Sequence, residues 1–137
     1  MRVKLTAITP PAGTLDPRKY ERAIRTAQGI AETVALQELR GSTRGWNHKP
    51  AFQIRRQGDV SEVTTDDAIF IYQDRGTKAH AIAPKSKRAL YWKGAPHPVK
   101  RVWHPGVPAQ QFSERAAAKM ERQYQRIVAD ELAKAAR

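Results

Sequence analysis

The sequence contains no cysteine, which excludes thiolate metal sites, disulfide frameworks and cysteine nucleophiles together. It also lacks any apolar run approaching the roughly 18 residues that a membrane-spanning helix requires. The opening segment, residues 2–8, alternates polar and apolar side chains, so it predicts a half-buried strand and not a signal peptide. An oxidising compartment is not required, and the cytoplasm of the producing cell is the expected location.

Acidic residues are few beside the basic ones. The chain has 13 Asp and Glu against 25 Lys and Arg, which gives a formal net charge of +12. Such an excess predicts attraction to polyanions and mutual repulsion between copies at low salt. Nucleic acid, a membrane surface and an acidic protein neighbour all fit this charge, so composition alone leaves the partner open.

A long amphipathic helix is expected in the first third of the chain. Asp16 followed by Pro17 is a favourable helix start, and Gly41 is a natural end. Glu32 and the basic residues of this segment are expected to face water. The inward-facing stripe is expected to comprise Tyr20, Ile24, Ala27, Ala31, Val34 and Leu39.

Short strands are expected in the middle of the chain, divided by turn residues. Residues 52–56 and 60–64 flank a Gly-containing link and predict a hairpin. Residues 66–72 contain a β-prone apolar run that favours a strand, with a short helix as the open alternative. Further short strands are expected at residues 80–83, 89–92 and 99–103.

A second amphipathic helix closes the chain, with Gln111 or Ser113 as its expected N-terminal cap. Its apolar stripe comprises Phe112, Ala116, Met120, Tyr124, Ile127, Val128 and Leu132. The length of 137 residues predicts a single domain spanning residues 1–137. The order of elements predicts an α+β fold, in which a mostly antiparallel sheet packs against the long N-terminal helix and a second helix ends the chain.

Residues that could carry chemistry are scattered. The four histidines have neither the helical nor the His-x-His spacing of a metal site, and surface histidines are the simpler interpretation. The serines lack a nucleophile elbow. Asp66 and Asp67 are adjacent, and we expect them to cap the apolar element that follows instead of forming an acid–base pair. The sequence therefore predicts no enzyme, no metal site and no cofactor.

Basic and aromatic residues are interleaved between residues 85 and 103. Such a pattern can hold a phosphate backbone and stack bases, although no recognised nucleic-acid motif accompanies it. The alternatives are lysines that protect a strand edge and aromatic rings that belong to a core or an interface. The candidate contacts with nucleic acid or an acidic partner are Lys85, Lys87, Arg88, Trp92, Lys100 and Arg101.

Three motif segments follow one another in the second half of the chain. They are Gly-Thr-x-x-His-x-Ile-x-Pro from Gly76, Ala-Leu-aromatic from Ala89, and His-Pro-Gly-x-x-Ala-x-x-Phe from His104. In this order they resemble the head–tail joining, or tail-completion, family of tailed bacteriophages. Gln111 stands where that family often has proline. The motif residues are Gly76, Thr77, His80, Ile82, Pro84, Leu90, His104, Pro105, Gly106, Ala109 and Phe112.

The resemblance implies a structural virion protein that joins the phage head to the tail. It would be a subunit of a homo-oligomeric ring, commonly six- or twelve-fold, at the neck or the upper end of the tail. Its partners would be further copies of itself, the portal or head-connector protein and the tail-terminator protein, with non-specific contact to genomic DNA left open and no membrane. It would lie in the virion, and in the host cytoplasm before assembly. The alternative is a free-standing basic nucleic-acid-binding protein.

The motif residues have expected roles in the architecture. Gly76 is expected to adopt a positive φ, and Phe112 to anchor the last helix. Leu90 and Trp92 are expected to share one face of a strand and pack on a helix. The expected subunit contacts are residues 41–50, residues 93–98 and the two chain ends, which we expect to be mobile in the free protein and to order on assembly.

Overall fold

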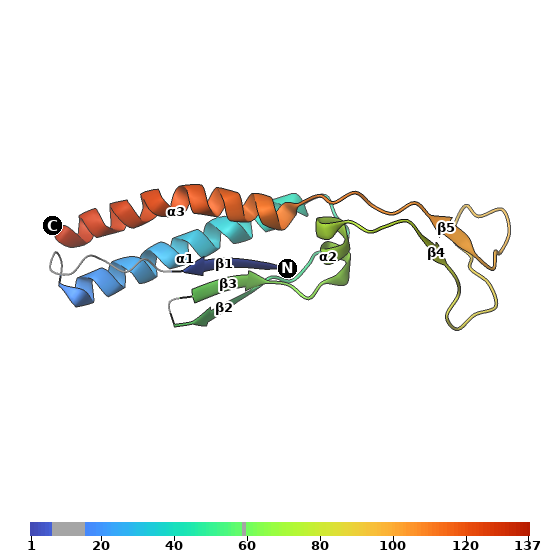
Figure 1. Cartoon of the computed structure of the whole chain (residues 1–137), viewed down its shortest axis with the longest axis horizontal. Coiled ribbons are helices and arrows are strands. Elements are labelled where there is room, and N and C mark those ends of the chain that lie inside the picture. Colours follow the sequence, from blue (N-terminus) through green and yellow to red (C-terminus); the bar gives the residue numbers. More distant parts are fainter. Residues whose placement is uncertain (7–15, 59) are drawn as a thin grey trace.

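The computed structural model describes residues 1–6, 16–58 and 60–137, and it shows an elongated molecule with an arm at one end (Figure 1). Two long antiparallel helices, α1 (Pro17–Ser42) and α3 (Phe112–Ala136), lie side by side in the body of the molecule. A three-stranded sheet packs against this pair, which confirms the expected α+β fold. In the part of the chain that the structure describes, none of the helices combines the length and the apolar character that crossing a bilayer requires.

Helix α1 begins where the sequence predicts. The Asp16 carboxylate caps it by accepting a hydrogen bond from the backbone N–H of Arg18 at 2.9 Å. Ala27, Ala31 and Ala35 recur every four residues on its inner face, and all three are fully buried. Because alanine adds only a methyl group to the helix surface, α3 can approach α1 closely along this row.

The end and the inner face of α1 differ in two details from the prediction. Gly41 remains helical, and the helix ends one residue later at Ser42. The reason is Thr43, which is buried and whose hydroxyl donates to the backbone carbonyl of Leu39 at 3.4 Å. Ala35 lies in the core where Val34 was expected.

Glu32 is buried, so the prediction that it faces water is wrong. Arg56 donates from Nε to Glu32 Oε1 at 2.8 Å, and its second nitrogen contacts the other carboxylate oxygen. The Arg56 guanidinium holds the pKa of Glu32 below its usual value, against the opposing effect of burial. Helical spacing could not reveal this contact, because the partner lies 24 residues away on a strand.

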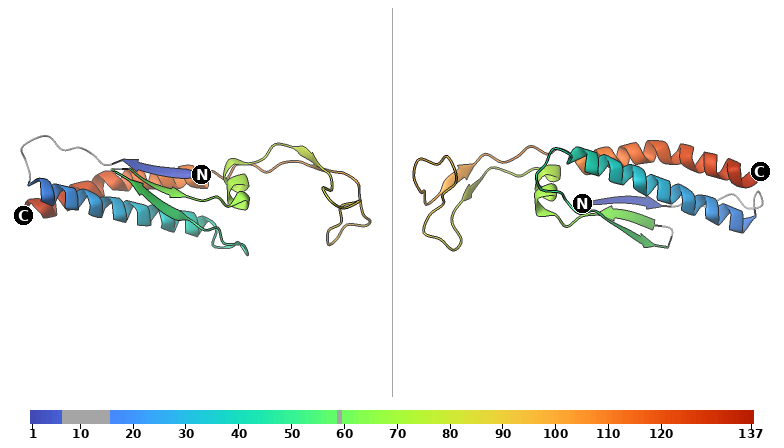
Figure 2. Two further views of the ribbon diagram at one scale, coloured as in Figure 1. Left: turned by 90° about the horizontal axis from the view of Figure 1, so that it is seen from below. Right: turned by 180° about the vertical axis from the view of Figure 1, so that it is seen from behind.

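The sheet contains β1 (Arg2–Thr6), β2 (Gln53–Gln57) and β3 (Val60–Thr64) in the order β1-β3-β2, with both pairs antiparallel. Val3 lies opposite Val63 on β3, and both are buried beneath the helices. Figure 2 shows the same arrangement of sheet and helices from two other sides. The expected hairpin is confirmed. The last two residues of the first predicted strand, 7 and 8, lie outside the described residues.

The apolar run after β3 forms helix α2 (Ala68–Arg75), so the strand favoured for residues 66–72 is wrong and the alternative of a short helix is confirmed. The Asp67 side chain caps α2 by accepting a hydrogen bond from the Phe70 N–H at 2.8 Å, as expected for this carboxylate. The helix places Phe70 and Asp74, one turn apart, in the interior. Burial of these two side chains outweighs the β-propensity of the intervening residues.

Four aromatic rings pack together where the body meets the arm. Phe70 is fully buried and lies 5.2 Å from Phe52, 5.6 Å from Phe112 and 6.3 Å from Trp46, measured between ring centroids. Phe112 therefore anchors the start of α3, as predicted. Trp46 belongs to the segment 41–50, and its packing against two of these rings argues against the mobility expected for that segment.

Residues 77–107 form the arm, which projects beyond α2 and away from α1 and α3 (Figures 1 and 2). It contains the antiparallel strands β4 (His80–Ile82) and β5 (Val102–His104). The strand expected at 89–92 does not form, since Leu90 makes only an isolated bridge with Val99. No residue of the arm is buried. Leu90 and Trp92 therefore do not pack on a helix, because the arm carries them away from α1, α2 and α3 (Figures 1 and 2).

Candidate functional site

The chain enters and leaves the arm through a joint, formed by residues 73–77 and 106–113. The Thr77 N–H donates to the Val107 carbonyl at 2.8 Å, and the Val107 N–H donates back to the Thr77 carbonyl at 3.1 Å. The Gln110 N–H donates to the Gln73 carbonyl at 2.9 Å. These bonds hold the outgoing and returning chains together at the end of α2, so they set the direction in which the arm leaves the body.

Two glycines make the joint sterically possible. Gly76 has φ +73°, which confirms the predicted positive φ, and Gly106 has φ +87°. A Cβ on Gly76 would lie 2.6 Å from the Val107 carbonyl oxygen, and one on Gly106 would lie 2.3 Å from that of Thr77. Both positions thus require glycine, because the positive φ disfavours any other residue and because a Cβ would collide with the facing backbone.

The start of α3 is capped from α2. Asp74 is buried, and its carboxylate accepts the backbone N–H of Ser113 at 2.8 Å and the Ser113 hydroxyl at 2.5 Å. Gln111 occupies the N-cap position, which confirms one of the two expected caps, but its side chain makes no capping hydrogen bond. Gln111 adopts φ +55°, a value closed to the proline that often stands there in the resembled family.

Asp74→Ala is expected to lower the free energy of unfolding by about 2 kcal/mol. The substitution leaves the Ser113 N–H and hydroxyl without their buried acceptor and removes the helix cap. Urea unfolding monitored by circular dichroism measures the change. Asp66→Ala is the matched control, since this exposed carboxylate should contribute less than about 0.5 kcal/mol. Equal losses in the two variants would contradict a structural role for Asp74.

The histidines of the resembled motif meet in the arm. His80 pairs with His104 across β4 and β5, and their ring centroids are 5.2 Å apart. His104 Nδ1 accepts the Gly106 N–H at 3.0 Å, which stabilises the turn at Pro105 and Gly106. His80 Nδ1 lies 2.8 Å from the Lys78 carbonyl oxygen. Both side chains therefore have contacts that shape the arm, and among the described residues no three His, Asp or Glu side chains gather as a metal site would need.

The other two histidines lie apart from this pair. His48 contacts the Asp67 carboxylate, the N-terminal cap of α2. The Phe70 N–H, and after it His48, hold the pKa of Asp67 below its usual range. His97 is exposed in the outer part of the arm.

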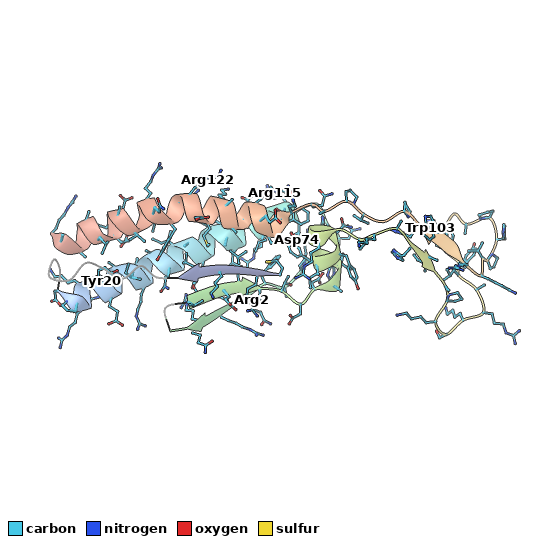
Figure 3. The ribbon with its side chains drawn as sticks, in the orientation of Figure 1. Arg2, Tyr20, Asp74, Trp103, Arg115 and Arg122 are labelled. Atoms are coloured by element: carbon cyan, nitrogen blue, oxygen red, sulfur yellow. The ribbon has the colours of Figure 1, made fainter. Side chains whose placement is uncertain are left out.

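The arm displays most of the residues that the sequence marks as binding candidates. All six are exposed: Lys85, Lys87, Arg88, Trp92, Lys100 and Arg101. Three large aromatic side chains of the arm are also exposed to solvent, with exposed fractions of 68% for Tyr91, 48% for Trp92 and 66% for Trp103. Figure 3 shows Trp103 on the arm, far from Asp74 at the junction of α2 and α3.

The structure divides the motif residues between the joint and the arm. Gly76, Thr77, Gly106, Ala109 and Phe112 lie at or beside the joint. The residues placed further along the arm are His80, Ile82, Pro84, Leu90, His104 and Pro105.

Sequence reasoning missed Asp74 and its role in the joint. The carboxylate caps a helix 39 residues further along the chain, so no local spacing could reveal it.

Comparison with models of known protein families, with curated proteins and with solved structures finds no match to the chain. The resemblance to the head–tail joining family therefore rests on the motif residues themselves.

Proposed function

We propose that the protein is a structural subunit of a homo-oligomeric ring that joins the head of a tailed bacteriophage to its tail, without catalysing a reaction. The observation that supports this most is the joint. The resembled motif residues Gly76, Thr77, Gly106 and Ala109 meet there and direct an arm that has no buried residue of its own. An arm that is held in a fixed direction and exposed to solvent can reach a component of the particle outside its own subunit.

The body carries exposed apolar side chains suited to subunit contacts. Ile30 and Ile54 are each 40% exposed, and Ile69 and Tyr72 of α2 are 51% and 59% exposed. A ring requires that one surface of each subunit meets a different surface of the next. Ile30 lies on α1, Ile54 on β2, and Ile69 and Tyr72 on α2, so exposed apolar side chains on different elements are available for such contacts. The portal or head connector and the tail terminator would then lie above and below the ring.

The charge of the arm also fits a free-standing nucleic-acid-binding protein. The two functions predict different outcomes for the phage. Loss of a joining subunit blocks particle assembly after the head and the tail have each been built. Loss of a free-standing binder leaves mature particles intact.

Electron microscopy of particles made without the gene tests the proposed function. We expect DNA-filled heads to accumulate apart from finished tails, and the purified protein to restore joined particles. DNA-filled heads carrying unfinished or overlong tails would place the subunit at tail completion within the same structural role. Normal infectious particles would refute the proposal.

Two glycine variants connect this experiment to the joint. Gly106→Ala should fail to restore joined particles, because its Cβ collides with the Thr77 backbone. Gly94→Ala is the matched control: Gly94 also has a positive φ, of +96°, but its Cβ would meet nothing within 4 Å. Equal rescue by both variants would show that the direction of the arm does not matter for joining.

A further inference from the structure

The positive charge of the chain is concentrated on the arm. Residues 77–107 contain seven Lys and Arg and no Asp or Glu, so they hold +7 of the formal net charge of +12. All seven are exposed: Lys78, Lys85, Lys87, Arg88, Lys93, Lys100 and Arg101. Among the described residues none of the seven forms an ion pair with a carboxylate. The arm, which lies at one end of the molecule (Figure 1), thus presents seven cations that are not neutralised by a carboxylate of the described residues.

The rest of the chain is a poor partner for this surface. Outside the arm, Lys and Arg still outnumber Asp and Glu, by 18 to 13. Many of the body's carboxylates already have partners: Glu21, Glu32, Glu38, Glu62, Asp67, Asp74 and Glu131. A second copy would therefore offer the arm few free carboxylates and a net repulsion, so the matching polyanion is a different molecule.

The composition of the arm distinguishes between polyanions. Five of its seven cations are lysines. Lysine is depleted in protein–protein interfaces but is a common point-charge ligand for phosphate. The cations of the arm are interleaved in the sequence with the exposed rings of Tyr91, Trp92 and Trp103. Proteins that bind single strands combine these two features, since the cations bind the phosphate backbone and the aromatic rings stack on the bases.

We propose that the arm binds single-stranded nucleic acid without sequence preference. Its lysines and arginines hold the phosphate backbone, and Trp92 and Trp103 stack on unpaired bases. The inference does not depend on ring formation, because it rests on the charge and the exposed rings of one chain. Its failure would leave the particle experiment above unaffected.

Fluorescence anisotropy of the full chain with a labelled single-stranded oligonucleotide and with the matching duplex tests the inference. We expect tighter binding of the single strand, and an affinity that falls steeply between about 50 and 200 mM salt. Replacement of Lys85, Lys87 and Arg88 by Gln should weaken binding roughly 100-fold at the lower salt and reduce the slope of log affinity against log salt by about 2. Trp103→Ala should weaken single-strand binding roughly 5- to 100-fold.

A matched control removes three charges from the body instead. Arg22, Arg122 and Arg126 are exposed on α1 and α3, and their replacement by Gln should leave most of the affinity unchanged. Equal damage by the body and arm variants would overturn the assignment to the arm. Duplex binding that matches the single strand and ignores Trp103→Ala would overturn base stacking. Binding of poly-glutamate but of neither oligonucleotide would show an acidic protein to be the partner and refute the inference.

Discussion

Phe70→Ala is expected to lower the free energy of unfolding by about 3–5 kcal/mol, the usual cost of emptying a fully buried phenylalanine site. The ring of Phe70 packs against those of Trp46, Phe52 and Phe112, so its loss opens a cavity between the segment after α1, the residue before β2, and the start of α3. The total free energy of unfolding of a domain of this size is about 5–15 kcal/mol. The variant should therefore be close to unfolding at physiological temperature. Urea unfolding followed by tryptophan fluorescence measures the loss.

Tyr72→Ala on the same helix is the matched control. Tyr72 is 59% exposed, and its removal should change the free energy of unfolding by less than about 1 kcal/mol. Phe70→Leu should recover part of the stability, because a leucine refills some of the cavity. If Phe70→Ala and Tyr72→Ala were equally mild, α2 would not pack against the body as described.

Gly106→Ala is expected to open the joint while leaving the body folded. The new Cβ would lie 2.3 Å from the Thr77 carbonyl oxygen and 2.9 Å from the Lys78 carbonyl carbon, at a φ of +87°. The φ cost and the lost Thr77–Val107 hydrogen bonds together amount to at least about 2 kcal/mol. Amide hydrogen exchange at Thr77 and Val107 should therefore become at least roughly 30-fold faster.

The controls for this prediction lie in the same chain. Amides of α1 and α3 should keep their protection in Gly106→Ala, because none of the arm residues contributes to the buried core. Gly94→Ala should leave exchange at Thr77 and Val107 unchanged, since its Cβ would enter open space. Slower or unaltered exchange at the joint in Gly106→Ala would show that the close backbone approach is not needed to hold the arm.

The sequence determined by itself the elements whose signals are local. The start of α1 follows from Asp16 and Pro17, which act within one turn of helix. The stripe of α3 and the hairpin of β2 and β3 follow from periodicities of 3.6 and 2 that extend over several residues. The positive φ of Gly76 followed from a glycine at a turn.

Only the tertiary structure decided the features that depend on residues far apart in the chain. The run around Phe70 has the propensity of a strand, but burial of one helical face makes it α2. Glu32 is buried because Arg56 lies on a neighbouring strand, and α3 is capped by Asp74 of another helix. The sequence predicted that Leu90 and Trp92 share a strand face and pack on a helix, yet the arm that carries them projects away from α1, α2 and α3. Local sequence patterns indicate which secondary structure a segment prefers. Burial and long-range hydrogen bonds determine whether the segment adopts that structure and where it lies in the fold.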